Sequence, residues 1–313
     1  MKSIISEKIN TAAVLTILFT FLAGCAPESK NLSSYQSSAA NESNHIVGGA
    51  KGTADYQQQN GIVGLLIVTK NELGEQSMSI CTGTLIAKNI VLTAAHCVAN
   101  PRITKIAAVF KTDAETATKA DLRFGQTSMI HPGYNPIKRS NGSNDDIALV
   151  KLQSDAPANF KFANLPNSIN SVDLLLNTKV TLAGYGVTNS IVNKSVIDKN
   201  GHEDIIPLKS VGSGTLRKVD NIPIVAISPD KKEILLQQSK SRGACHGDSG
   251  GPAFTHLMNG TAIQVGLTSR ATNLLGNCNE GAIYTSVAAY LPWINATAAK
   301  LQAVSLTTTA AVK

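Results

Sequence analysis

The feature that most limits what this chain can fold into is a series of short apolar runs separated by Gly, Asn and Pro. Each run has the length and composition of a β-strand. The runs cover residues 62–69, 79–86, 103–110, 180–183, 222–227 and 263–268. No long amphipathic helix interrupts them before the end of the chain, where Leu291 and Pro292 open a predicted helix. This pattern predicts an all-β protein of the barrel or sandwich class.

Composition is that of a globular exported protein. The 313 residues can form two domains with their own cores. Charged residues make up only 16%, and 28 Lys and Arg against 21 Asp and Glu give a net charge of +7. No block of Lys and Arg indicates a nucleic-acid surface. We therefore predict no nucleic-acid partner and no cofactor.

Residues 1–25 have the organisation of a secretory signal, with a basic start and an apolar run that is too short to span a membrane comfortably. The run ends in Leu-Ala-Gly-Cys, which resembles a bacterial lipobox and implies cleavage before Cys25 and lipid on its sulfur. The alternative is an ordinary signal peptide. Of five cysteines, four can form two pairs, which leaves Cys25 over for a lipid.

Residues 26–45 are polar and contain almost no apolar side chains. Such a composition predicts a flexible linker or propeptide. With the lipid on Cys25, we expect an exported protein anchored to the bacterial cell envelope and its membrane.

The stretch 243–252 places a small nucleophile, Ser249, among several glycines. Glycines let the backbone turn its N–H groups toward one point, which a reaction that develops negative charge on oxygen requires. Asp248 is too close in sequence to accept the proton of Ser249. The same residue types are also common in turns, so this interpretation needs a base and an orienting acid elsewhere.

His96 is the candidate base, because it adjoins Cys97 and a second cysteine, Cys81, lies a short loop upstream. A disulfide across this loop would contribute on the order of 3 kcal/mol and would fix the backbone of His96. The candidate acids are Asp145 and Asp146, which precede an apolar strand. Either could be a turn residue or a buried carboxylate that holds the tautomer of a histidine.

Five short motifs follow one another between residues 46 and about 300. The motifs are Ile46-Val47-Gly48-Gly49, Thr93-Ala94-Ala95-His96-Cys97, Asp146-Ile147-Ala148-Leu149, Gly184-Tyr185-Gly186 and Gly247-Asp248-Ser249-Gly250-Gly251-Pro252. This order resembles that of the trypsin/chymotrypsin serine proteases. The resemblance implies two six-stranded antiparallel Greek-key barrels and a short C-terminal helix. We expect barrels over about 46–160 and 161–290, a helix over about 291–302 and a tail over 303–313.

The resemblance also implies the chemistry of a serine endopeptidase that acts on proteins or peptides as a monomer. His96 matches the base and Ser249 the nucleophile, and Asp146 matches the orienting acid because Asp-Ile-Ala-Leu fits the motif whereas Asp145 does not. Gly247 and Ser249 match the residues whose N–H groups bind the oxyanion.

Activation by a new N-terminus is a further implication. After cleavage before Ile46 by an unidentified protease, the new amino group would pair with Asp248. Cleavage there would also release the domain from the lipid. His45 stands where many relatives carry Arg or Lys, so a trypsin-like activator is not expected.

The resemblance assigns the substrate pocket as well. Cys245 and Cys278 match a disulfide that frames the pocket, and Gly243 matches its base, where trypsins carry Asp. Ala271 and Ala282 stand at wall positions often held by glycine. We therefore expect small or medium apolar residues before the scissile bond.

Other positions leave alternatives open. Ser269 matches the serine that supports the buried acid, but Arg270 stands where tryptophan is usual, and Glu280 could supply a substitute charge to the pocket. The polar stretch 189–214 is either a surface insertion or a loop that contacts substrate. A calcium site is conceivable at acidic residues of irregular spacing, but we predict no metal. These residues are Asp113, Glu115 and Asp121.

Two other functions compete with the endopeptidase. One is a binding or regulatory homologue that never activates, which His45 and Arg270 would favour. The other is an esterase-like hydrolase that uses the same residues.

Overall fold

The computed structural model describes residues 46–137, 143–166, 174–197 and 203–310. The predicted signal segment with Cys25 and the predicted linker 26–45 lie outside these residues. Within the described part of the chain, no helix is both long enough and apolar enough to cross a membrane.

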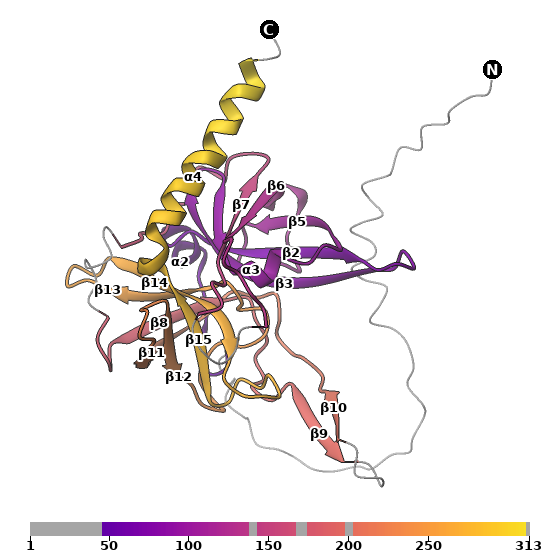
Figure 1. The fold of residues 1–313 in the computed structure, drawn as a ribbon, viewed down its shortest axis with the longest axis vertical. Helices are drawn as coiled ribbons and strands as arrows, with labels where there is room; N and C mark the ends of the chain where they lie inside the picture. The colour runs from indigo at the N-terminus through magenta and orange to yellow at the C-terminus, as the bar shows by residue number, and fades with distance from the viewer. Residues whose placement is uncertain (1–45, 138–142, 167–173, 198–202, 311–313) are drawn as a thin grey trace. The chain divides into compact units, whose positions relative to one another are not determined.

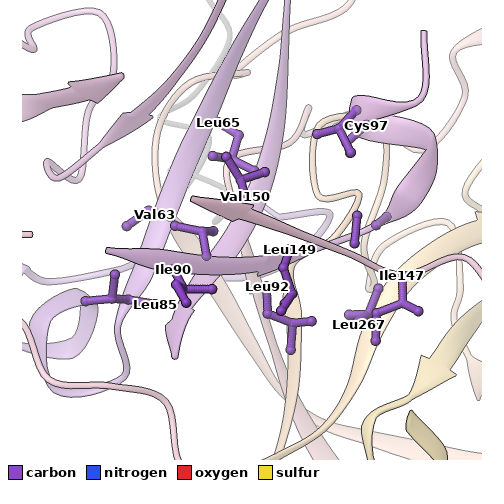
Figure 2. Close-up of a cluster of buried hydrophobic side chains, with 14 of the residues drawn as sticks. Val63, Leu65, Leu85, Ile90, Leu92, Cys97, Ile147, Leu149, Val150 and Leu267 are labelled. Atoms are coloured by element: carbon purple, nitrogen blue, oxygen red, sulfur yellow. The ribbon is translucent and has the colours of Figure 1, made fainter. Parts of the chain in front are cut away.

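The first half of the described chain forms a closed antiparallel barrel with the strand order β2-β3-β4-β7-β6-β5 (Figure 1). Its strands are β2 (Ile62–Lys70), β3 (Gln76–Ala87), β4 (Ile90–Thr93), β5 (Ile103–Val109), β6 (Leu122–Ile130) and β7 (Ala148–Leu152). Alternating apolar side chains fill the interior, where Leu92 of β4 lies opposite Leu149 of β7 (Figure 2). Both side chains are fully buried.

The second half forms another closed barrel, with the order β11-β12-β15-β14-β13-β8 and a pairing of β8 with β11 that closes it. Its strands are β8 (Lys179–Gly184), β11 (Arg217–Ile227), β12 (Glu233–Gln237), β13 (Pro252–His256), β14 (Ala262–Ala271) and β15 (Gly281–Ser286). A short strand, β1 (Ala50–Lys51), is added to β11. The prediction of two six-stranded antiparallel barrels is confirmed, and every apolar run that predicted a strand coincides with one, the run 103–110 extending one residue beyond β5.

The C-terminal helix α4 (Val287–Ala310) begins directly after β15, earlier than the predicted start at Leu291. Pro292 therefore lies inside the helix rather than at its first turn. Apolar side chains along α4, including Tyr290 and Ile294, belong to the core cluster of the first barrel. The helix thus connects the end of the second barrel to the first.

The remaining elements are short. They are α2 (Ala54–Gln59), α3 (Ala95–Val98), a 3-10 turn (Lys119–Asp121), β9 (Asn193–Ile197) and β10 (Glu203–Pro207). Strands β9 and β10 pair with each other in a hairpin that extends away from the second barrel (Figure 1). The polar stretch 189–214 thus contains a two-stranded sheet of its own, formed by β9 and β10.

Candidate active site

His96 and Asp146 are brought together by two paired strands of the first barrel. Thr93, the last residue of β4, lies opposite Ala148, the first residue of β7. In an antiparallel pair, residues just beyond the end of one strand lie next to residues just before the start of the other. Asp146 consequently accepts hydrogen bonds from the backbone N–H of His96 at 2.9 Å and pairs with its Nδ1 at 2.8 Å.

The Asp146 carboxylate is buried, and the second barrel supports it. Ser269 of β14 donates its hydroxyl to Oδ2 at 2.7 Å, and Thr285 of β15 donates to the Asp146 carbonyl at 3.0 Å. Burial alone would raise the pKa of Asp146, but the hydrogen bonds and charge of His96 and the Ser269 bond outweigh it. The pKa therefore lies below its ordinary value, and Asp146 is ionised beside the imidazole.

Asp145, the other candidate acid, points into a different network. Its carboxylate accepts hydrogen bonds from Lys232 at 2.7 Å and from the hydroxyl of Tyr290. The backbone of Asp145 has a φ of 50°, in the left-handed region. Of the two aspartates, only Asp146 contacts His96 in the described part of the chain.

Ser249 lies in the loop between β12 and β13, and it lines the same cavity as His96. The Ser249 carbonyl accepts a hydrogen bond from the N–H of Thr82 on β3 at 2.8 Å. A Cβ on Gly250 would lie 2.1 Å from the hydroxyl of Thr93, so only glycine lets this loop approach the end of β4 so closely. The close approach brings the Ser249 loop next to the strand that precedes His96.

Two backbone donors in this loop are free to bind an oxyanion. Within the described residues, the N–H groups of Gly247 and Ser249 donate no hydrogen bond to the protein. Gly247 has a φ of 96°, a conformation that favours glycine. Neighbouring unpaired N–H groups are what an oxyanion site requires.

Asp248 is turned inward, away from the cavity, and only 1% of it is exposed. Its carboxylate accepts hydrogen bonds from the N–H groups of Gly186 and Cys245, each at 2.8 Å. A Cβ on Gly184 or Gly186 would lie within 2.5 Å of this carboxylate, which explains both glycines of the Gly-Tyr-Gly motif. Burial raises the pKa of Asp248 to about 7, although these two hydrogen bonds and the charge of Arg217 oppose the shift.

The segment that follows the predicted cleavage site lies in the same region. Ile46 is fully buried in the core of the second barrel, and Val47 clusters with Cys245 and Cys278. The Gly243 N–H donates to the Val47 carbonyl at 2.9 Å. Ile46 and Val47 are thus packed close to the loop that carries Asp248.

The cavity in front of His96 and Ser249 has a volume of about 590 Å³. Three of the predicted pocket residues, Ser269, Ala271 and Ala282, line it, but Gly243 does not. Glu280 also lies outside its lining, because its side chain is exposed and accepts a hydrogen bond from Asn273 at 2.9 Å. Among the lining residues, Asp146 carries the sole carboxylate.

Arg270 lines the cavity and is held by a residue that the sequence analysis did not identify. Its guanidinium forms two hydrogen bonds with the carboxylate of Glu233, at 2.9 Å each. Glu233 also accepts a bond from the N–H of Asn144, two residues before Asp146. β12 and β14 lie on either side of β15, so strand order brings Glu233 and Arg270 together, and no sequence motif marked Glu233.

The predicted disulfides Cys81–Cys97 and Cys245–Cys278 are both formed. In the described chain, the sulfur atoms of each disulfide lie close enough to a histidine, His96 or His246, to suggest a metal site. Sulfur atoms in a disulfide, however, cannot act as thiolate ligands. Two of the acidic residues considered for calcium form hydrogen bonds with nearby backbone groups. Asp113 accepts a hydrogen bond from the Glu115 N–H, and Asp121 accepts one from the Thr118 N–H at the start of the 3-10 turn.

Comparison with known proteins adds a consistent set of relatives. The Trypsin family matches residues 46–294. A chymotrypsin of Phaedon cochleariae is 28% identical over 71% of this chain and 72% of its own length, and human kallikrein-7 is 31% identical over 70% and 78%. The solved structure of HL collagenase covers 80% of this chain and 97% of its own with a TM-score of 0.59; at 18% identity it shows the fold alone.

Proposed function

The chain belongs to the Trypsin family of serine proteases, and on this basis we propose that it is a serine endopeptidase that uses Ser249, His96 and Asp146. The observation that carries the proposal is the 2.8 Å contact between His96 Nδ1 and a buried Asp146 carboxylate, with Ser249 on the same cavity. An ionised acid behind the ring fixes the tautomer in which the other nitrogen can accept a proton.

The proposed reaction follows the general course of Ser-His-Asp proteases. His96 accepts the proton of the Ser249 hydroxyl as its oxygen attacks the scissile carbonyl, and returns that proton to the leaving amine. The N–H groups of Gly247 and Ser249 stabilise the oxyanion, with each donor worth about 3 kcal/mol in comparable sites. Water then attacks the acyl-enzyme, and His96 again accepts and returns a proton.

Activation is proposed to act through Asp248. A buried carboxylate with a pKa of about 7 has only N–H dipoles and the charge of Arg217 to stabilise its ionised form. A new amino group at Ile46 would supply a full positive charge at a segment that already packs near this loop. The ion pair would order the Gly247 N–H and the cavity wall.

The precursor is proposed to be exported and held at a bacterial envelope by lipid on Cys25. The reason remains the Leu-Ala-Gly-Cys sequence and the fact that both disulfides are formed without Cys25. Cleavage before Ile46 by another protease would separate the catalytic domain from the lipid. Mass spectrometry of active protein would contradict this step if the active chain still began at acylated Cys25.

For substrates, we propose small or medium apolar residues before the scissile bond. Ala271 and Ala282 line the cavity at positions where the family resemblance often has glycine, and the sole carboxylate on its lining is Asp146, which His96 and Ser269 already engage. A basic side chain would therefore lose its hydration without gaining a counter-charge.

A fluorophosphonate probe tests the proposed activity directly, because it reacts only with an activated serine. We expect strong labelling after removal of residues 1–45, weak labelling before it, and none in Ser249→Ala, which should fold normally. Peptide amides and esters measured in parallel separate a peptidase from an esterase. No labelling in either form would favour a binding homologue and overturn the proposal.

A further inference from the structure

The space beside Gly243 is occupied by another side chain. Gly243 is buried, and a Cβ added to it would lie 2.4 Å from Cδ and 2.6 Å from Oε1 of Gln238. Both contacts are closer than carbon atoms approach in proteins, so no larger residue fits at 243 while Gln238 stays in place. The volume that a side chain at 243 would fill is therefore taken by the carboxamide of Gln238.

Gln238 is fixed in this position from both ends of its amide. Its Nε2 donates to the Ala244 carbonyl at 3.1 Å, and its Oε1 accepts from the Ala244 N–H at 2.6 Å. Only 6% of the residue is exposed. A buried amide bonded on both sides has one orientation, and moving it would leave two backbone groups of Ala244 unpaired.

Strand geometry places Gln238 next to the cavity wall that Ala282 lines, although Gln238 itself is not among the lining residues. Leu236 pairs with Ala282, which lines the cavity, and the ladder continues past β12 because the Gln238 N–H donates to the Glu280 carbonyl at 3.1 Å. Side chains two residues apart on a strand share a face, so Gln238 follows Leu236 on the face of Ala282. Its partner Ala244 adjoins Cys245, another lining residue.

From these contacts we propose that Gln238 closes the pocket for the residue before the scissile bond and sets its depth and neutrality. The inference rests on the proposed protease function and deepens it. A neutral amide lies beside Gly243, where the family resemblance puts the base of the pocket. Ala271 and Ala282 limit the width of the pocket, and Gln238 limits its length.

A purely structural role of Gln238 and a role in substrate specificity predict different effects of its replacement. If Gln238 only supported the 243–245 segment, its replacement would lower kcat/KM for all substrates by the same factor. If it closes the pocket, its replacement changes the ratio between substrates. The ratio of kcat/KM values, rather than kcat/KM itself, is therefore the informative quantity.

The experiment uses the processed enzyme and peptides that differ only in the residue before the cleaved bond: Ala, Leu, Phe or Lys. In Gln238→Ala, which lengthens the pocket, we expect the Phe/Ala ratio to rise by about 10- to 200-fold. Gln238→Glu keeps the size and the bond from the Ala244 N–H but places a carboxylate oxygen against the Ala244 carbonyl. A substrate ammonium would relieve that contact, so we expect the Lys/Ala ratio to rise at least about tenfold.

Two further variants serve as controls. Gln238→Met preserves the volume without the amide and should keep Phe excluded. Gln237→Ala removes a neighbouring glutamine whose side chain is exposed, and it should leave all ratios unchanged. Fluorophosphonate labelling and thermal unfolding establish that each variant is folded and has an active serine. Should the alanine variant not fold, the glutamate variant of equal size decides.

Normal labelling of the Gln238 variants with substrate ratios within about twofold of the parent would overturn the inference and leave the proposed function standing. Absence of labelling in the processed parent would overturn the proposed function and this inference with it.

Discussion

The first barrel holds its two functional side chains at the ends of paired strands, whereas the second holds Ser249 in a glycine-rich loop. The ladder between β4 and β7 places His96 next to Asp146. The Ser249 loop instead contains a buried acid, Asp248, whose pKa is raised to about 7. The difference teaches that strand pairing alone sets the position of the proposed proton-transfer pair, whereas the loop of the proposed nucleophile contains the buried acid through which we propose the activation switch acts.

The barrels also support each other across the site. Ser269 of the second barrel donates to Asp146, and Thr82 of the first donates to the Ser249 carbonyl. Changes in either barrel should therefore affect activity, but they should do so for different reasons and at different stages of maturation.

The largest effect is expected from Asp146→Asn. An amide would hold the wrong tautomer of His96, and kcat should fall by about 10⁴-fold with little change in the fold. The matched control is Asp145→Asn, which removes a neighbouring carboxylate bonded to Lys232 and Tyr290. Steady-state kinetics of the two processed variants make the comparison. Equal losses in both would contradict the assignment of Asp146.

Asp248→Asn tests the switch in the second barrel through pH. The folded chain before cleavage binds a proton on Asp248 up to about pH 7, whereas the unfolded chain releases it near 3.8. Between these values the folded state holds more protons, so stability falls as pH rises, by on the order of 4 kcal/mol in total. We expect the Asn precursor to lack this slope in urea unfolding between pH 4 and 8.

The same variant should behave differently after cleavage. Without the Asp248 carboxylate, a buried amino group at Ile46 has no partner, and activity should fall by about 10²- to 10³-fold. Identical pH slopes for parent and variant precursors, or full activity of the cleaved variant, would show that Asp248 is not the switch.

Removing each disulfide compares the two barrels by stability. Cys81–Cys97 spans 16 residues and Cys245–Cys278 spans 33. Loop entropy predicts losses of about 3 and about 4 kcal/mol on replacement of each pair by alanine. Cys245 belongs to the loop that carries Asp248, whereas Cys97 only contacts that loop, with its sulfur 3.6 Å from the Ser249 carbonyl oxygen. Loss of the second disulfide should therefore reduce fluorophosphonate labelling of the folded protein at low temperature more than loss of the first. Equal fluorophosphonate labelling of the two disulfide variants would contradict this expected difference between the barrels.

The smallest effect is expected from Arg270→Ala. It leaves the Glu233 carboxylate with the Asn144 N–H but without its cation. The pair is partly exposed, at 25% and 13% of its side chains. We therefore expect a stability loss of only about 1–2 kcal/mol, measured by chemical denaturation. Glu233→Gln should cost less, since a neutral amide tolerates the site better than an unpaired charge.

The sequence by itself determined the β-class, the order of the motifs, the disulfide cysteines and the residues His96, Asp146 and Ser249. These features are local: strand periodicity, glycines beside a serine, and an aspartate at the mouth of an apolar run can be identified within a few residues. Motif order then supplied the expectation of two barrels. Choosing Asp146 rather than Asp145 as the partner of His96 required either the Asp-Ile-Ala-Leu motif or the pairing of β4 with β7.

Only the tertiary structure decided which distant residues meet. Periodicity gives the face of a strand but not the strand beside it, so the bond between Glu233 and Arg270 could not be predicted. For the same reason the sequence could not predict that the carboxamide of Gln238, just beyond the end of β12, lies beside Gly243.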